Sequence, residues 1–227
     1  MSHTCNDRTT ELKKQLIQPA HDVRYLLSQG YPKIGAIQFV CDHYRLTVHQ
    51  RHVLARIVMV PDLVGPRESK RVSCSDLENC SVAVDGYNVL IAVESILKGH
   101  CMWLGDDGYA RDTRGIFRKF RMTDDTFQAV DIVLRMLHTQ NVKYVHIILD
   151  SQISNSGELA AYLFKELVKY HLDGDAFTSK HADHDLKMDD SDIVATADGV
   201  IIDAVDHVVD IPACIMDMMG IIPATIP

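Results

Sequence analysis

Short hydrophobic runs that end at an aspartate recur in the second half of the chain. Four such runs occupy residues 82–84, 144–149, 193–197 and 200–202, and the aspartates that follow them are Asp85, Asp150, Asp198 and Asp203. Runs of this length are typical of strands buried on both faces of a parallel sheet. The pattern therefore predicts a sheet whose strands carry acids at their carboxyl ends.

Between these runs, apolar residues recur with the period of a helix. Val89, Val93 and Ile96 share one helical face directly after Asp85, and residues 127–137 and 159–170 show the same spacing. Strands that alternate with amphipathic helices predict an α/β fold, here a mostly parallel sheet flanked by helices. Further strands are expected at 176–180 and 207–209.

The first 60 residues show only the helical period. Pro19 is expected to open one helix, and Thr47 with Gln50 forms a capping box for a later helix that ends at Pro61. The next residues are polar and rich in turn formers, which is typical of a linker. The expected organisation is a small all-α domain at 1–62, a linker at 63–80 and an α/β domain at 81–227.

Composition narrows the class of protein. With 227 residues, of which 47% are hydrophobic, the chain can form a substantial core. It contains no apolar run of membrane-spanning length, and its first residues lack the apolar segment of a signal peptide, so a cytoplasmic location without a membrane partner is expected. The six cysteines form no C-x-x-C pair and are expected to remain thiols.

Charge is distributed unevenly along the chain. Residues 1–72 contain 11 Lys and Arg against 6 Asp and Glu, whereas residues 73–227 contain 12 against 25. A basic segment beside an acidic, cation-binding one suits a polyanionic substrate. The alternative is an uneven distribution of ordinary surface charge.

The recurring aspartates indicate a cation site. Ligands of open α/β sheets bind beyond the carboxyl ends of the strands, so acids at several strand ends converge on one crevice. Clustered carboxylates select Mg²⁺ or Mn²⁺ rather than zinc. The alternative for each aspartate is a helix cap or a turn, for which this residue type is also common.

A charged loop follows the first predicted helix of the α/β domain. In GDDGYARDTRG, at residues 105–115, Arg111 and Arg114 alternate with acids. Guanidinium groups bind phosphates through paired hydrogen bonds, so this loop is a candidate for substrate contact. The alternative is a surface loop in which these charges pair with one another.

Two short motifs resemble the NYN and PIN-like nuclease superfamily. VDGYNVL, at 84–90, resembles its first strand, and ATADG, at 195–199, resembles its closing strand. The wider chain is similar to an uncharacterised archaeal family in which a helical domain of unknown function, the 434 type, precedes a PIN-like domain of unknown function, the 5616 type. The matching segments are AHDVRYLLSQGYPKIGAIQFVCDHYRL, DGYNVL, DDGYARD, DSQISNSGELA and TADGVIID.

The resemblance implies roles for particular residues. Asp85 and Asp198 correspond to the metal-binding acids of the first and closing strands, and Asn88 is a polar neighbour. Asp150 and Asp183 are the nearest candidates for further acids. In this chain the polar segment before the closing strand is expected to be too short for the helix that the superfamily carries there.

These observations predict a metal-dependent ribonuclease that uses Mg²⁺ or Mn²⁺ to hydrolyse RNA phosphodiester bonds. RNA is the expected partner, and a second copy of the chain is a further candidate. The alternative is a non-catalytic RNA-binding or scaffold protein. A phosphatase of the haloacid dehalogenase type is disfavoured, because it requires Asp-x-Asp after the first strand. The predicted site consists of catalytic Asp85, Asp150 and Asp198, metal-binding Asp85, Asp150, Asp183 and Asp198, and substrate-binding Asn88, Arg111 and Arg114.

Overall fold

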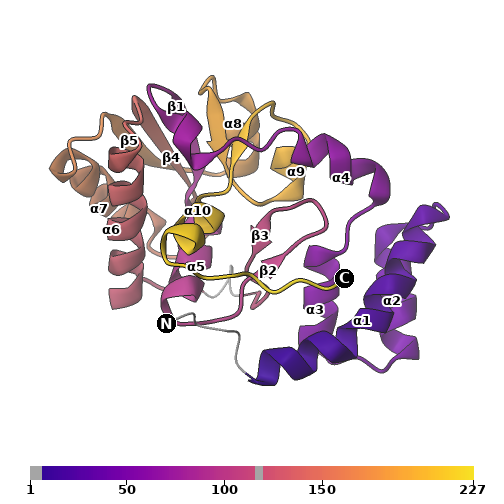
Figure 1. The fold of residues 1–227 in the computed structure, drawn as a ribbon. Coiled ribbons are helices and arrows are strands. Elements are labelled where there is room, and N and C mark those ends of the chain that lie inside the picture. Colours follow the sequence, from indigo (N-terminus) through magenta and orange to yellow (C-terminus); the bar gives the residue numbers. More distant parts are fainter. Residues whose placement is uncertain (1–6, 116–119) are drawn as a thin grey trace. The chain divides into compact units, whose positions relative to one another are not determined.

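The computed structural model describes residues 7–115 and 120–227 (Figure 1). The chain divides into two compact units, and each unit is assembled from separate stretches of sequence. Unit 1 comprises Met1–Ser69, His100–Gly115 and Met216–Pro227, and unit 2 comprises Lys70–Gly99 and Ile116–Ile215. Unit 1 therefore contains more than the first 62 residues, and unit 2 lacks the loop 100–115 and the last residues.

Helices form most of unit 1. They are α1 (Asp7–Ser28), α2 (Lys33–His43), α3 (Val48–Ile57) and α4 (Pro61–Glu68), followed by an antiparallel pair of short strands, β2 (Trp103–Leu104) and β3 (Ala110–Arg111). The prediction of an all-helical segment before the sheet is confirmed. Among the described residues, no helix is both long and apolar enough to cross a membrane.

Two prolines behave differently from the sequence prediction. Pro19 lies inside α1 rather than at its start, because the buried stripe of Leu16, Ala20 and Val23 continues past it and tertiary packing outweighs the missing hydrogen bond. Pro61 occupies the first turn of α4, where its absent N–H has no partner to lose. The segment predicted as a linker thus contains a helix and a 3-10 turn, η1 (Cys74–Leu77).

The residues at the start of α3 form the capping hydrogen bonds that the sequence predicted. Thr47 Oγ1 accepts a hydrogen bond from the Gln50 backbone N–H at 3.3 Å, and the Gln50 side chain accepts one from the Thr47 N–H at 2.8 Å. This reciprocal pair satisfies two donors that the helix leaves unpaired. The predicted capping box is confirmed.

The core of unit 1 includes residues from distant parts of the chain. Trp103, Ala224 and Ile226 pack with the buried faces of α1, α2 and α3. The backbone of Ala224 also pairs with the segment before and within β2, through Leu104 N–H to Ala224 O and Ala224 N–H to Met102 O, each at 2.8 Å. Residues 224 and 226 therefore belong to the same core as α1, α2 and α3.

Within the described residues, unit 2 contains a five-stranded parallel sheet in the order β5-β4-β1-β6-β7. This confirms the predicted α/β fold. The strands are β1 (Ser81–Asp85), β4 (Tyr144–Asp150), β5 (Gly174–Ser179), β6 (Ile193–Ala195) and β7 (Val208–Val209).

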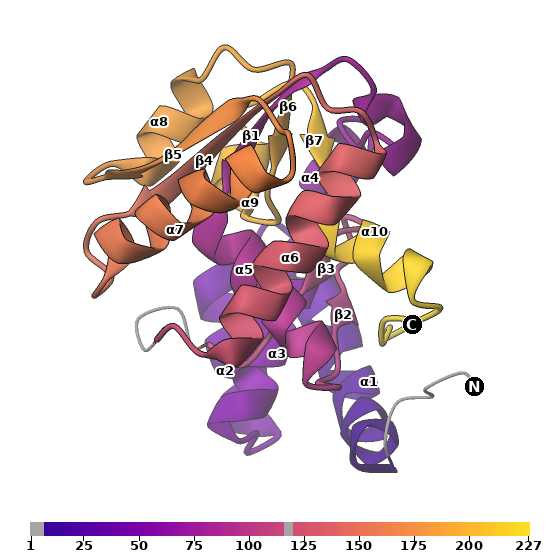
Figure 2. The same cartoon turned by 90° about the vertical axis from the view of Figure 1, so that its left-hand side faces the viewer.

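Helices cover both faces of this sheet (Figure 2). Val82 and Val84 point to one face, which packs against α5 (Gly86–Leu97), α6 (Asp124–Thr139) and α7 (Ser156–Lys169). Ala83 points to the other face, where α8 (Ala182–Met188) and α9 (Gly199–Ile202) contribute Leu186 and Ile201. The alternation follows from the two-residue period of a strand.

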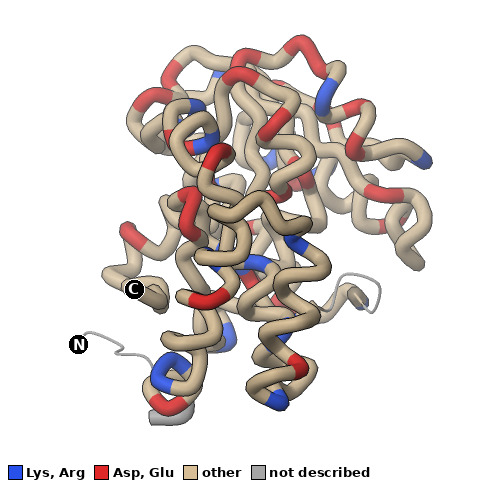
Figure 3. The backbone as a smooth tube through the Cα atoms, turned by 90° about the vertical axis from the view of Figure 1, so that its right-hand side faces the viewer, with Lys and Arg blue, Asp and Glu red and all other residues tan. Residues whose placement is uncertain are grey.

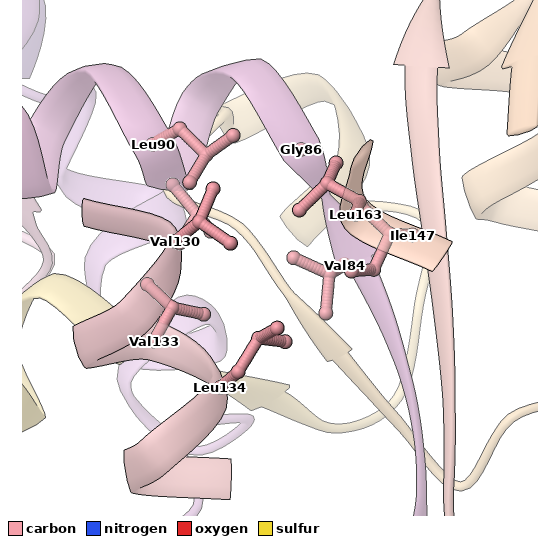
Figure 4. Close-up of a pocket in the computed structure, with 9 residues that line it drawn as sticks. Val84, Gly86, Leu90, Val130, Val133, Leu134, Ile147 and Leu163 are labelled. Atoms are coloured by element: carbon pink, nitrogen blue, oxygen red, sulfur yellow. The ribbon is translucent and has the colours of Figure 1, made fainter. Parts of the chain in front are cut away.

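A small cavity lies inside the first of these layers, and Figure 4 shows its lining. Its walls are apolar side chains from β1, β4, α5, α6 and α7. Gly86 lies at one side, where α5 starts directly against β4: a Cβ there would lie 2.5 Å from Leu149 Cδ2 and 3.1 Å from the Ile148 carbonyl oxygen. The absence of a side chain at position 86 allows this close approach.

Two predictions about the segment around β6 are wrong. Residues 200–202 form α9 rather than a strand, because Asp198 Oδ1 accepts a hydrogen bond from the Val200 N–H at 2.8 Å and starts a helix. The polar segment before Ile193 does contain a helix, α8, although only Leu186 of it is buried. A helix that buries one side chain leaves little hydrophobic periodicity to detect.

The prediction of free thiols is also wrong for one pair. Cys74 and Cys214 form a disulfide within unit 2, with their Cα atoms 6.0 Å apart although 140 positions separate them in sequence. Cys41, Cys80 and Cys101 are outside any disulfide, and Cys5 lies outside the described residues. A pairing made by the fold across such a distance leaves no spacing motif in the sequence.

Candidate functional site

The direction of chain winding reverses between β1 and β6. From the central β1, the chain continues to β4 and β5 on one side, and then crosses to β6 and β7 on the other side. At such a reversal the connections leave in opposite directions, so a crevice opens beyond the carboxyl ends of the two strands. The residues at the carboxyl ends of β1 and β6 are therefore the first candidates for a site.

Asp85 is the last residue of β1 and also the N-cap of α5. One of its carboxylate oxygens, Oδ1, accepts a hydrogen bond from the Asn88 backbone N–H at 3.4 Å. The other, Oδ2, accepts one from Thr196 Oγ1 at 2.9 Å. The carboxylate is thus fixed between the start of a helix and the end of the neighbouring strand.

Thr196 connects the two aspartates of the reversal point. It follows β6 and is 2% exposed. Its hydroxyl donates to Asp85 and accepts a hydrogen bond from the Asp198 backbone N–H at 3.1 Å. The Asn88 side chain adds a second link, because its Oδ1 accepts a hydrogen bond from the Ala197 N–H at 3.0 Å.

The electrostatics of the site show that its acids influence one another. The pKa of Asp85 is raised from its ordinary value of 3.8 to about 7, mainly by burial and to a smaller extent by the negative charges of Asp198 and Asp183. The hydrogen bonds from Thr196 and Asn88 act in the opposite direction. The structure thus brings Asp85, Asp198 and Asp183, in the first turn of α8, into one electrostatic neighbourhood.

Asp150 ends β4, the strand on the other side of β1. Asp85 is paired with Ile148 in the sheet, so Asp150 lies two residues farther along, about 7 Å in the strand direction. Its Oδ1 accepts a hydrogen bond from the Gln152 N–H at 2.8 Å. Its charge also helps to raise the pKa of Tyr87 to about 12, after the larger effect of burial.

The two predicted phosphate-binding arginines belong to unit 1, where they pair with acids of their own loop. Arg111 is 3% exposed and donates from both terminal nitrogens to the buried Asp107. Arg114 Nε lies 3.2 Å from each carboxylate oxygen of Asp112. This arrangement matches the alternative of a self-paired loop.

Two residues at strand ends were missed in the sequence. Thr196 lies in the ATADG motif but was assigned no role, because a threonine is an ordinary residue in a strand. Asp210 follows β7, is 4% exposed, and accepts a hydrogen bond from the Ala213 N–H at 2.9 Å. It had a usable signal, since residues 207–209 form another run that ends at an aspartate.

The side chains at the ends of β1 and β6 determine which metal ions the site could bind. Among residues 7–115 and 120–227, no three His, Cys, Asp or Glu side chains are grouped to hold an ion. Mg²⁺ needs no such cage, because proteins usually hold it through one or two carboxylates and leave the remaining positions to water and phosphate. The carboxylates of Asp85 and Asp198 are oxygen donors of the type that Mg²⁺ and Mn²⁺ prefer, and they lack the His and Cys ligands of a closed transition-metal site.

Comparison with known proteins places the chain in a family. The family model described as Domain of unknown function (DUF5616) matches residues 74–214. The chain belongs to this family. The DUF5616 segment contains both Asp85 and Asp198, and ahead of it residues 15–70 match a second model, Protein of unknown function (DUF434).

The chain is also similar to a protein that it matches over most of the length of both sequences. An uncharacterized protein of Methanocaldococcus jannaschii is 33% identical over 194 residues, which cover 85% of this chain and 92% of the relative. The predicted two-domain layout of an uncharacterised archaeal family is therefore found. No solved structure matches the chain.

Proposed function

We propose that this protein is a metal-dependent ribonuclease that hydrolyses RNA phosphodiester bonds at the crevice between β1 and β6. The observation that supports the proposal is the position of Asp85 and Asp198 at the point where the sheet reverses, where the Thr196 hydroxyl donates to the Asp85 carboxylate and accepts from the Asp198 backbone N–H. A buried acid beside a second acid has an unfavourable charge, and a bound divalent cation would relieve it.

The proposal assigns roles to the acids at the strand ends and to their hydrogen-bond partners. Asp85 and Asp198 would hold the ion, with Asp183 and Asp150 extending the negative field around it. When bound, Mg²⁺ or Mn²⁺ supplies charge neutralisation and activation of water for attack on phosphorus. Thr196 and Asn88 position the two strand ends. Arg111 and Arg114 have no part, because their guanidinium groups bind Asp107 and Asp112.

The excess of acids in unit 2 would oppose RNA binding at this crevice unless a cation is bound. Its residues include 21 Asp and Glu against 12 Lys and Arg, whereas unit 1 has 10 against 11. Figure 3 marks these positions along the backbone, with acids in red and bases in blue. An RNA phosphate would be repelled from such a surface, so binding at this crevice requires divalent ions.

Cleavage of labelled single-stranded RNA tests the proposal. Wild type should cleave in Mn²⁺ and stop in EDTA, and Asp85→Asn should lose activity by about 100-fold or more, because a ligand is lost. Asp190→Asn is a matched control, since Asp190 is an exposed acid of the same unit. Equal cleavage by wild type and Asp85→Asn, or cleavage that persists in EDTA, would show that this site is not responsible.

One observation favours a non-catalytic RNA-binding protein as the second candidate. Both oxygens of Asp85, and Oδ1 of Asp198 and Asp150, already accept hydrogen bonds from the protein. Acids used in this way can serve as caps alone. This candidate predicts that wild type shifts labelled RNA in a gel equally in EDTA and Mn²⁺, without cleaving it.

A further inference from the structure

The disulfide of unit 2 joins two segments that border one edge of the sheet. Cys74 lies at the start of η1, shortly before β1, and Cys214 lies in α10 (Ile211–Met218), shortly after β7. Both cysteines pack against the main core of the unit. The disulfide therefore joins the segment before β1, the first strand of the sheet along the chain, to the helix after β7, the last one.

The segment that precedes β1 covers the β7 edge of the sheet. We call residues 70–77 the strap. The Val72 N–H donates to the Val208 carbonyl oxygen at 2.9 Å, and the Val208 N–H donates to the Lys70 carbonyl oxygen at 2.8 Å. Since β7 is the last strand in the sheet order, the strap pairs backbone groups that an open edge would leave available to other chains.

Besides the disulfide, the strap is held by non-covalent contacts at both of its ends. Lys70 Nζ donates to the carbonyl oxygens of Ile202 and Asp203, at 2.9 and 3.1 Å, near the end of α9. Leu77 is fully buried and fixes the far end of the strap. Between these two anchors, the disulfide holds the strap to α10.

We infer that the Cys74–Cys214 disulfide is a redox-sensitive latch that keeps the strap on β7, and that its reduction by a dithiol opens this edge of the sheet. The inference does not depend on the proposed function. It rests on the disulfide, on the two backbone hydrogen bonds of the strap, and on the position of β7 at the edge.

The exposure of the two cysteine residues indicates how the latch opens. Cys74 is partly exposed, whereas Cys214 is 5% exposed. A thiolate of the dithiol attacks Cys74 Sγ and releases Cys214 as a thiolate, which takes up a proton. The second thiol of the reductant then closes on its own sulfur and leaves Cys74 as a thiol. Two electrons and two protons pass to the protein, and the reductant becomes a cyclic disulfide.

Hydrogen exchange on the full chain tests the latch. Peptide mapping without reductant should first show the Cys74 peptide joined to the Cys214 peptide. After treatment with dithiothreitol, the amides of Val72 and Val208 should exchange about tenfold faster, because a local opening becomes easier. The amide of Val145, which donates to Asp173 between β4 and β5, should keep its rate.

Two variants complete the design. Cys74→Ser/Cys214→Ser should show the fast exchange without reductant and should not respond to it. Cys80→Ser retains the disulfide and should respond as wild type does. If the double variant does not fold, the wild-type comparison still decides. Absence of the joined peptide, unchanged exchange at Val72 and Val208, or equal acceleration at Val145 would each overturn the latch, the last because it reports general destabilisation.

Discussion

At the scale of single residues, Asp85 combines a structural role with a strongly raised pKa. Its carboxylate caps α5 and accepts a hydrogen bond from Thr196, yet burial keeps its pKa near 7. A cap that is costly to ionise at neutral pH is a poor choice for stability alone. This conflict is the kind of local exception that marks candidate functional sites.

The first prediction concerns the pH dependence of stability. From pH 4 to 7, Asp85 ionises in the unfolded chain before it does so in the folded one, so the folded state loses up to about 4 kcal/mol as pH rises. Asp85→Asn lacks this titration. Urea unfolding of both proteins at pH 4.5 and pH 8 should show the variant gaining stability relative to wild type at the higher pH. A difference independent of pH would contradict the raised pKa.

Residue identity alone revealed part of this site. Asp85 and Asp198 were predicted because each follows a hydrophobic run, which is a local pattern. Their connection through Thr196 was not predicted, because the hydrogen bond spans 111 positions and depends on β1 and β6 being neighbours. The buried pairing of Arg111 with Asp107 was one of two readings that the alternating charges left open.

At the scale of elements, the packing of α5 against β4 sets the geometry of the site. The helix begins directly after Asp85, so its first residue, Gly86, must lie against the backbone of β4. This contact is tight because parallel strands stand only about 5 Å apart. The carboxylate position therefore depends on a residue that has no side chain.

Gly86→Ala is predicted to destabilise the protein by about 1–3 kcal/mol, since its Cβ would meet Leu149 and the Ile148 carbonyl oxygen. Gly157→Ala is the matched control in the first turn of α7, where a Cβ meets nothing within 4 Å. That change should be neutral or stabilising, by up to about 1 kcal/mol. Denaturant midpoints compare the two, and equal effects would refute the close approach.

Elements were predicted well where their signals are local. Strands β1, β4 and β6 and the capped helix α3 have clear hydrophobic periods or capping residues. The three apolar residues of α9 were assigned to a strand, because so short a run has no period that separates strand from helix. Asp198 caps this turn by accepting a hydrogen bond from the Val200 N–H, and the residues therefore form a helix. Because Asp198 lies outside the run 200–202, the run alone does not predict the helix.

At the scale of the whole molecule, the units do not follow the order of the sequence. Unit 1 takes its core from the first helices, from Trp103 and from the last residues. The sequence predicted a linker at 63–80 between the two domains, and the division of units passes between 69 and 70, inside that segment. The return of 100–115 and 216–227 to unit 1 was not predictable, because these contacts are made only in three dimensions.

The contribution of the last residues can be measured through the single tryptophan. Ile226→Ala removes a side chain that is 6% exposed and should cost about 2–4 kcal/mol, with the emission of the buried Trp103 losing its blue shift at lower denaturant. Ile222→Ala removes the same atoms from a side chain that is 80% exposed and should change little. Similar midpoints for the two variants would show that the end of the chain does not support unit 1.

The interleaving of the two units has a consequence for synthesis. Ala224 and Ile226 belong to the core around α1, so this core stays incomplete until residues 224–226 have been translated and have cleared the ribosomal exit tunnel. Until then the nascent polypeptide must hold its first helices without their last packing partners. A stalled or prematurely terminated chain would therefore expose this apolar surface to chaperones and proteases.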